Sequence, residues 1–503
     1  MELLQNLAIG FGVALTPVNL GFAFIGAMVG TLIGVLPGIG PIATIAMLLP
    51  LTFHLEPISG LIMLAGIFYG AQYGGSTTAI LVNLPGETSS VVTCIDGHQM
   101  ARQGRAGAAL AVAALGSFFA GCISTALIAG FAPPLARVGQ SFGSPEYFSL
   151  MVLGLIAAVV LAHGSVVKAV AMIILGLLIG LVGTDGNTGG TRFTFGIREL
   201  TDGIDVATLA IGLFGVGEII TNLSQSEQSR SVITQKITRL WPTGDDFRRA
   251  WPAVLRGTAL GSVLGVLPGG GATLSSFAAY ALEKKSSKDP SRFGRGAVEG
   301  VAGPESANNA GAQTSFIPML TLVIPGNAVM ALMIGALMIH GIQPGPQIMA
   351  ERPTLFWGMI ASMWIGNLML VIINLPLIGM WVQLLKVPYR FLYLSILLFC
   401  GIGVYTVNNS AAAVLLAAFF GIAGYVFYKL ECEPAPLILG FVLGPLMEEN
   451  LRRAMRISGG DPMIFVHRPI SLGLLIAALL LLLIVALPAI RSKREEVFQE
   501  QET

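Results

Sequence analysis

Long apolar runs recur along this chain, and each is close to the 20 residues that an α-helix needs to cross a bilayer. Clear examples cover residues 148–163, 166–182, 354–380 and 471–490. We count about 12 such spans. The chain has too little polar surface for a soluble protein, because 54% of its 503 residues are hydrophobic and only 11% are charged. Backbone polar groups in lipid must be satisfied within the chain, so the sequence predicts an all-α polytopic membrane protein.

A helix-breaking motif occurs twice inside these apolar segments. GVLPGIG at residues 34–40 is matched by GVLPGGG at residues 265–271, and the aligned prolines are 231 residues apart (268 minus 37). The match continues upstream, where Gly26 and Gly30 correspond to Gly257 and Gly261. Proline removes a backbone donor from a helix, and glycine permits the unwound backbone that results. The motif therefore predicts a broken helix at equivalent places in two halves.

A second pair of motifs follows the first in the same order. Gly-Ala-Gln at residues 70–72 leads to Pro-Gly at 85–86, and Gly-Ala-Gln at 311–313 leads to Pro-Gly at 325–326, with a difference of one residue in spacing. Two motifs in order at a near-constant offset indicate duplication. Broken helices at corresponding positions of two repeats are typical of secondary transporters, which bind their substrate at those breaks.

The charges of equivalent loops predict that the two halves are inverted. The loop at residues 53–58 has no Lys or Arg, whereas its counterpart at 284–295 carries five. After the second motif the bias reverses, with Arg102 and Arg105 in the first half and Arg352 alone in the second. The positive-inside rule then places equivalent loops on opposite faces. Charge alone leaves open whether the LPGxG segments are re-entrant hairpins or full spans, and it leaves the C-terminal orientation open.

These features divide the chain into four parts. We expect an N-terminal transmembrane repeat at residues 1–223, a cytoplasmic basic linker at 224–250, a C-terminal transmembrane repeat at 251–470, and a terminal helix with a polar tail at 471–503.

Small neutral polar residues flank the second pair of breaks. They can donate to a carboxylate without the cost of a buried charge, and free N–H groups at a helix N-terminus suit the same ligand. Gly, Ser and Thr also serve in helix packing, which is the alternative for them. The candidate substrate-binding residues are Ser76, Thr77, Thr78, Asn83, Gly86, Asn308, Asn309, Gln313, Thr314, Ser315 and Asn327.

The LPGxG breaks are the candidate ion sites, because unwound carbonyls and helix C-termini suit Na⁺. The residues concerned are Pro37, Gly38, Gly40, Pro268, Gly269 and Gly271. Two acidic residues lie beside the other breaks. Glu87 is placed either in a vestibule or in a solvated loop, and Glu305 either contacts substrate or sodium or caps a helix from its first turn. We expect no cofactor other than Na⁺ as coupling ion.

The motifs together resemble the TctA family, the large membrane subunits of bacterial tripartite tricarboxylate transporters. The resemblance rests on YGGSTTAIL at 73–81 with NLPGE at 83–87, on GPESANNA at 303–310 with IPG at 324–326, and on GTD at 183–185 with RFTFG at 192–196. GPLMEENLRR at 444–453 and SGGDP at 458–462 extend it over nearly the whole chain. One departure is Asp185-Gly186-Asn187, where the family would have proline after the aspartate.

The resemblance implies uptake of citrate or another di- or tricarboxylate across the bacterial inner membrane, driven by an ion gradient. It also implies two protein partners, a small TctB-like transmembrane subunit and a periplasmic TctC-like solute-binding protein. We expect the binding protein to dock near Arg192 and Arg198.

Other function classes fit the sequence less well. No basic stripe with interleaved aromatic residues is present, so nucleic acid is not an expected partner. No nucleophile–base or metal constellation supports an enzyme, and no catalytic residue is assigned. A passive channel for small organic anions stays the alternative, because broken helices also build selectivity filters.

Overall fold

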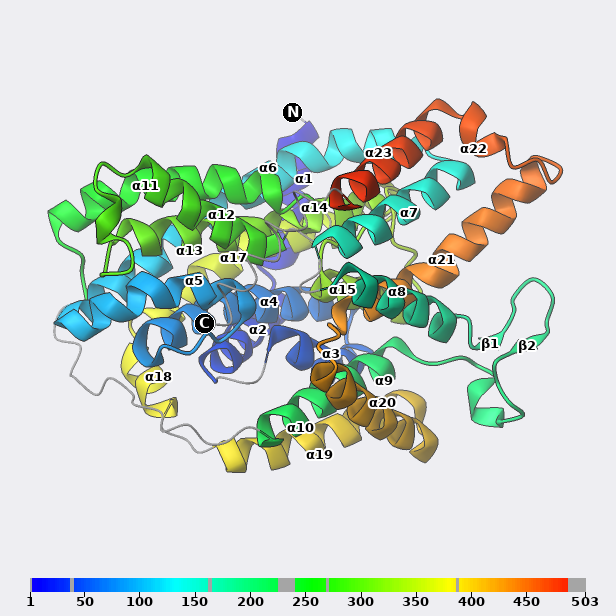
Figure 1. The fold of residues 1–503 in the computed structure, drawn as a ribbon, viewed down its shortest axis with the longest axis horizontal. Coiled ribbons are helices and arrows are strands. Elements are labelled where there is room, and N and C mark those ends of the chain that lie inside the picture. The colour runs from blue at the N-terminus through cyan, green and yellow to red at the C-terminus, as the bar shows by residue number, and fades with distance from the viewer. Residues whose placement is uncertain are drawn as a thin grey trace.

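The computed structural model describes residues 2–36, 40–161, 165–224, 240–267, 271–385 and 389–486. It is almost wholly helical (Figure 1), and the described part has one small sheet, in which β1 (Gly183–Thr184) pairs antiparallel with β2 (Thr191–Arg192). This confirms the predicted all-α polytopic class. In the described part five helices are long and apolar enough to cross a membrane, and seven shorter apolar helices accompany them. How many of the shorter ones cross the bilayer stays a prediction.

The five long apolar helical segments share a mean composition that suits lipid and lie at both ends and in the middle of the chain. They are Pro17–Val35, Ala101–Gln140, Val206–Ser224, Pro353–Asn374 and Ala411–Lys429.

In the first half, α2 (Pro17–Val35) packs closely along α4 (Pro57–Val82). Glycines make this approach possible, because a Cβ at Gly30 would lie 2.8 Å from Cα of Ile67, and a Cβ at Gly74 would lie 2.9 Å from Cα of Gly34. Small residues at such positions let two helix backbones touch, which is how helices associate in a membrane without a hydrophobic driving force. The two helices therefore form one unit.

The second half repeats this pairing with α11 (Gly244–Leu264) and α13 (Glu299–Thr314). A Cβ at Gly261 would lie 2.7 Å from Cα of Ala307, and one at Gly265 would lie 2.6 Å from Cα of Gly311. Gly261 and Gly265 are the residues that the sequence pairs with Gly30 and Gly34. The duplicated glycines thus mark a duplicated helix packing.

Each pair continues into a break with the same backbone conformation. Asn83 ends α4 in the left-handed region at φ 58°, and Val323 ends α14 (Phe316–Leu322) at φ 61°. Four residues later Glu87 and Asn327 are extended and begin the next helix. Both pairs are 240 residues apart (323 minus 83 and 327 minus 87). The structure therefore repeats at the breaks as well as in the helices.

The one-residue difference between the halves falls where α13 and α14 meet. α4 runs through this region as a single helix, whereas the second half ends α13 at Thr314 and starts α14 at Phe316, with Ser315 between them. The Ser315 hydroxyl donates to the Ala312 carbonyl at 2.7 Å and satisfies a group that the break frees.

The two halves interlock across the centre of the molecule. α6 (Ala106–Gln140) belongs to the first half and packs on α13, while α17 (Pro353–Asn374) belongs to the second half and packs on α4. Figure 1 shows α4, α13 and α17 together inside the molecule. Each polar helix is covered by an apolar helix of the other half, so every residue of α4 from Ser59 and of α13 from Gly300 is buried.

Helices α20 (Ala411–Lys429) and α23 (Pro469–Ala486) lie on the outside. α20 exposes a row of large apolar side chains, among them Leu415, Phe419 and Ile422. An apolar surface of this kind suits contact with lipid. The hairpin β1–β2 projects at one end of the molecule, beside α21 (Ala435–Ile457) (Figure 1).

The remaining helical elements connect these parts. They are α1 (Glu2–Ala14), α3 (Pro41–Thr52), η1 (Thr88–Ser90), α5 (Val91–Thr93), η2 (Cys94–His98), η3 (Ala101–Arg105), α7 (Ser144–Leu161), α8 (Val166–Gly180), η4 (Arg198–Leu200), α9 (Val206–Ala210), η5 (Ile211–Val216), α10 (Gly217–Ser224), α12 (Gly271–Ser286), η6 (Pro290–Arg292), α15 (Ala328–Ile339), α16 (Ile348–Glu351), α18 (Ile378–Leu384), α19 (Tyr389–Asn408) and α22 (Ile464–His467). The last residues of the predicted linker, 244–250, thus lie in α11.

Candidate functional site

A buried carboxylate lies where the two halves meet. Glu305 is 1% exposed and sits in the middle of α13. The Ser76 hydroxyl of α4 donates to its Oε2 at 2.5 Å, and the Thr93 hydroxyl of α5 donates to its Oε1. Since α13 begins at Glu299, Glu305 does not cap this helix from its first turn. It instead joins three elements that are distant in sequence.

Glu87 forms a second polar group on the same side of α13. Its Oε1 accepts from Nδ2 of Asn308 at 3.4 Å and contacts the Ser89 hydroxyl. Ser89 also lies 2.9 Å from Oε1 of Gln72, one turn before Ser76 on α4. Glu87 is half-buried rather than fully solvated, so the structure places it in the polar interior and not in a free loop.

The next asparagine faces a different helix. Nδ2 of Asn309 donates to the Ser117 hydroxyl of α6 at 2.7 Å and to the Glu305 carbonyl at 3.1 Å. One turn later, Oε1 of Gln313 accepts from the Thr125 hydroxyl at 3.5 Å. Asn308 and Asn309 therefore point to opposite sides of α13, and both sides are polar.

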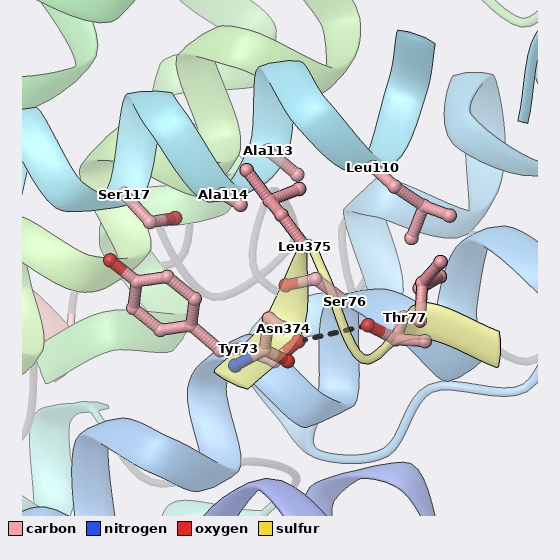
Figure 2. A pocket seen from close by; sticks show the side chains of 10 residues that line it. Tyr73, Ser76, Thr77, Leu110, Ala113, Ala114, Ser117, Asn374 and Leu375 are labelled. Carbon is pink, nitrogen blue, oxygen red and sulfur yellow. Dashed lines mark hydrogen bonds between the residues drawn. The ribbon is translucent and has the colours of Figure 1, made fainter. Parts of the chain in front are cut away.

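A small cavity of about 10 Å³ adjoins this network (Figure 2). Tyr73, Ser76 and Thr77 of α4, Ser117 of α6 and Asn374 of α17 are among the residues that line it. A cavity of this size holds about one water molecule. The structure thus shows the polar network closed, and a di- or tricarboxylate needs the surrounding helices to move apart.

Several candidate hydroxyls satisfy backbone carbonyls. Thr78 donates to the Val35 carbonyl at 2.9 Å and so ties α4 to the end of α2, just before the first LPGxG break. Thr77 and Thr314 donate to carbonyls of their own helices, at 3.4 Å and 3.0 Å. These contacts are structural, and the structure does not gather Thr78 and Thr314 with Ser76.

Asn83, Gly86 and Asn327 lie at the breaks themselves. Asn83 is exposed at the end of α4, and Asn327 caps α15 by accepting from the Met330 amide at 2.9 Å. A Cβ at Gly86 would lie 2.5 Å from Cα of Gly75, so the break is folded tightly against α4.

The LPGxG segments are only partly described. Pro37, Gly38, Pro268 and Gly269 lie outside the described residues, so the Na⁺ sites predicted there stay predictions. Gly40 precedes α3, and its amide donates to Oε1 of Glu218 at 3.2 Å. Gly271 opens α12. The contact with Glu218 was not expected from the sequence, because 178 residues separate the two partners.

Arg192, one of the two candidate docking residues, is engaged in an ion cluster. Its Nη1 lies 2.8 Å from Oε1 of Glu448 on α21, and Arg452 lies 2.7 Å from Glu448 and 3.1 Å from Asp185. The cluster attaches the hairpin to α21. Arg198 is exposed at the start of η4 and is the more accessible of the two.

The cluster stays ionised at physiological pH. The backbone amide of Asn187 and the hydroxyl of Thr188, with Arg452 and Arg192 adding to the effect, lower the pKa of the Asp185 carboxyl to about 2. Because this pKa is depressed, the favourable contacts are present above the ordinary pKa of an aspartate and are lost only as the pH falls through 2.

Sequence reasoning did not assign Gln72, Ser89, Thr93 or Ser117 to the site. Ser89 and Thr93 belong to a run of hydroxyl residues directly after the Pro-Gly break, and that run was an available signal. Ser117 lies among the small residues of α6 and gave none.

The buried polar helices, their duplicated breaks and their apolar cover define a multi-pass membrane transport protein. Residues 20–439 match the model of the tripartite tricarboxylate transporter TctA family. The chain therefore belongs to this family, whose members are the large membrane subunits of three-part transporters and not enzymes.

Two relatives come from Agrobacterium vitis. One, described as "Uncharacterized 52.8 kDa protein in TAR-I ttuC' 3'region", is 61% identical over 502 residues, which cover 100% of both chains. The other, described as "Uncharacterized protein in TAR-II ttuC' 3'region", is 60% identical over 242 residues, which cover 48% of this chain and 100% of the relative. No solved structure matches the chain.

Proposed function

We propose that this chain is the subunit through which a di- or tricarboxylate crosses the bacterial inner membrane, driven by a Na⁺ gradient. A TctB-like small transmembrane subunit and a TctC-like periplasmic binding protein complete the transporter, and the binding protein delivers substrate near Arg198. Membership of the TctA family supports the three-part organisation. The observation that carries the proposed site is the buried polar network in which residues of both halves meet, at Ser76 and Glu305.

Three buried polar atoms in this network support carboxylate binding. Oδ1 of Asn308, Nε2 of Gln313 and the Tyr73 hydroxyl have no hydrogen-bond partner among the described residues. Buried polar groups are normally paired, because leaving one unpaired costs about 1–3 kcal/mol. The amide of Gln313 and the hydroxyl of Tyr73 are donors, and together with Ser117 and Asn309 they offer the contacts that a carboxylate accepts.

The closed network also suits alternating access. Its links between the halves are side-chain hydrogen bonds, such as Ser76 to Glu305 and Asn309 to Ser117. When these links open, α4 and α13 separate and expose the unpaired donors to a substrate entering from one side.

Proteoliposomes that contain all three subunits test the function. Wild type should accumulate a carboxylate above equilibrium when a Na⁺ gradient is imposed, and a panel of di- and tricarboxylates identifies the substrate. Equilibration without accumulation would instead identify a passive channel.

Two substitutions test the site. Ser76→Ala and Asn309→Ala should each abolish uptake while expression and assembly stay intact. Asn450→Ala is the matched control, because Asn450 donates to the carbonyl four residues before it just as Asn309 does, but lies on α21. Undiminished uptake in both site variants would show that the substrate binds elsewhere.

A further inference from the structure

We infer that Glu305 and Glu87 bind the coupling cation, Na⁺, at a site between α4, the η1–α5 segment and α13. The inference rests on the proposed cation-driven uptake and moves the ion from the LPGxG breaks to the second pair of breaks. It is argued from the oxygen atoms that meet there and from the charge that they leave unbalanced.

The oxygen atoms of this site come from three elements and are of one chemical kind. Glu305 brings two carboxylate oxygens, each in contact with a hydroxyl, Ser76 on one side and Thr93 on the other. Glu87 brings a carboxylate that contacts the Ser89 hydroxyl and the Asn308 amide. Carboxylate, hydroxyl and amide oxygens are the ligands of hard cations, whereas transition metals favour nitrogen and sulfur.

The charge of the two carboxylates is not balanced by any side chain in the described part of the chain. Other acidic side chains that are almost fully buried have a basic partner: Glu283 is 2.6 Å from Arg256, and Glu146 is 2.7 Å from Arg468. Glu305 is as deeply buried, yet its side-chain contacts are hydroxyls. A buried charge without a partner is costly, and acidic residues inside a membrane bundle mark ion pathways.

The Asn308 amide points to a ligand independently of the acidic residues. Asn308 is 0% exposed, and its Nδ2 donates to Glu87 at 3.4 Å. Oδ1 of the same amide is buried with no partner among the described residues. An acceptor oxygen beside a carboxylate repels it unless a positive charge lies between them. A cation at this position would be held by both.

The position of this site explains why cation and substrate should bind together. Asn309 and Gln313 offer donors on one side of α13, and Glu305 and Asn308 face the other side. A di- or tricarboxylate placed beside two bare carboxylates is repelled, and a bound cation removes that repulsion. By linkage the substrate must then raise the affinity for the cation by the same factor.

The site occurs once in the chain although the break occurs twice. The residue that corresponds to Glu87 in the second break is the neutral Asn327, and the residue 240 positions before Glu305 is Ala65. The duplication therefore supplies two breaks, of which one has the charge for a cation.

Binding of ²²Na⁺ and uptake by the full three-part complex test the inference. Wild type should bind Na⁺ more tightly when saturating substrate is present, by a factor of about 5–150. Glu305→Gln and Glu87→Gln should lose this Na⁺ binding and the Na⁺ stimulation of uptake. They should keep substrate exchange across the membrane, which needs no net movement of the cation. Glu299→Gln is the matched control on α13, because Glu299 contacts Arg292 at the end of that helix and should behave as wild type.

A milder substitution covers the case in which these variants do not assemble. Thr93→Val keeps the shape of the side chain and removes one hydroxyl from Glu305, so it should raise the Na⁺ concentration for half-maximal uptake about tenfold.

The possible failures are distinguishable. Unchanged Na⁺ binding in Glu305→Gln and Glu87→Gln would overturn the inference and leave the proposed function standing. Wild-type uptake driven by a pH gradient in place of Na⁺, and lost in Glu305→Gln, would overturn Na⁺ as the ion. Absence of gradient-driven uptake in wild type would overturn the proposed function itself.

Discussion

The break at residues 83–87 and the break at residues 323–327 have the same backbone but different chemistry. Asn83 and Val323 are left-handed, and Glu87 and Asn327 are extended and start the next helix. The packing partners also correspond, since Gly86 lies against Gly75 and Gly326 lies against Ser315. The first break carries a buried acid and the second a neutral cap.

The difference shows which property the duplication kept. The geometry of a broken helix requires particular residues at few positions, and both halves keep that geometry. Charge is not required for it, because Asn327 begins a helix as well as Glu87 does. Each substitution below asks whether one break can tolerate the chemistry of the other.

The largest effect is expected from closing the space at the first break. In Gly86→Ala the new Cβ would lie 2.5 Å from Cα of Gly75, and a backbone atom cannot move aside easily. We expect a loss of about 3 kcal/mol, the upper end of overpacking, measured as a fall in the thermal midpoint of the purified protein. Gly326→Ala is the control, because its nearest neighbour would be Cβ of Ser315 at 3.4 Å. An equal fall in both variants would contradict the tighter packing of the first break.

The left-handed residues should respond in opposite directions. Valine is β-branched and tolerates this conformation poorly, so Val323→Gly should stabilise the protein by about 1 kcal/mol. Asn83→Val should destabilise it by about 1–2 kcal/mol, because asparagine adopts the conformation more readily. The thermal midpoints of the two variants measure this. A destabilised Val323→Gly would mean that the valine side chain, which is 4% exposed, contributes more by packing than it loses by strain.

The neutral cap should be replaceable by another cap. Asn327→Ala removes the acceptor for the Met330 amide and should cost about 1 kcal/mol, whereas Asn327→Ser should cost less. Thermal midpoints compare the two, and Na⁺ dependence of uptake should be unchanged in Asn327→Ser. A lost Na⁺ dependence would show that the second break also takes part in cation binding.

The smallest effect on either break is expected from the projecting hairpin. Arg198→Ala removes an exposed charge, so it should slow productive docking of the binding protein about threefold at low salt, with less effect at high salt. Uptake at varied binding-protein concentration measures this. Arg192→Ala, which removes a member of the ion cluster, should be more damaging. If Arg198→Ala also changed the Na⁺ dependence, the hairpin would be coupled to the breaks.

The sequence predicted the fold class, the two pairs of breaks and the glycines that define the repeat. It placed Ser76 and Asn309 in one polar region, and the structure brings both into contact with Glu305. It left Glu305 undecided, because a carboxylate near a proline looks the same in sequence whether it caps a helix or lies within one. The partners Thr93 and Ser117 depend on long-range packing of α5 and α6, which local patterns do not encode.

Arg192 illustrates the opposite difficulty. In the sequence an arginine in a polar loop suggested a free docking residue, whereas the structure places it in the ion cluster with Glu448, 256 residues away. The GPLMEENLRR segment at 444–453 contains the complementary charges, but only the fold shows that this segment faces the hairpin.

The glycine-mediated pairing of α2 with α4 and of α11 with α13 limits how this molecule can change shape. Atoms of two backbones that already touch have nowhere to slide, so each pair must travel as one solid piece. The surfaces that can part are those joined only by side chains, including the Ser76–Glu305 contact and the Thr88–Thr273 contact of 3.0 Å. The seam of the machine therefore runs between α4 and α13, and a bifunctional cross-link across it should lock transport where one within either pair would leave it free.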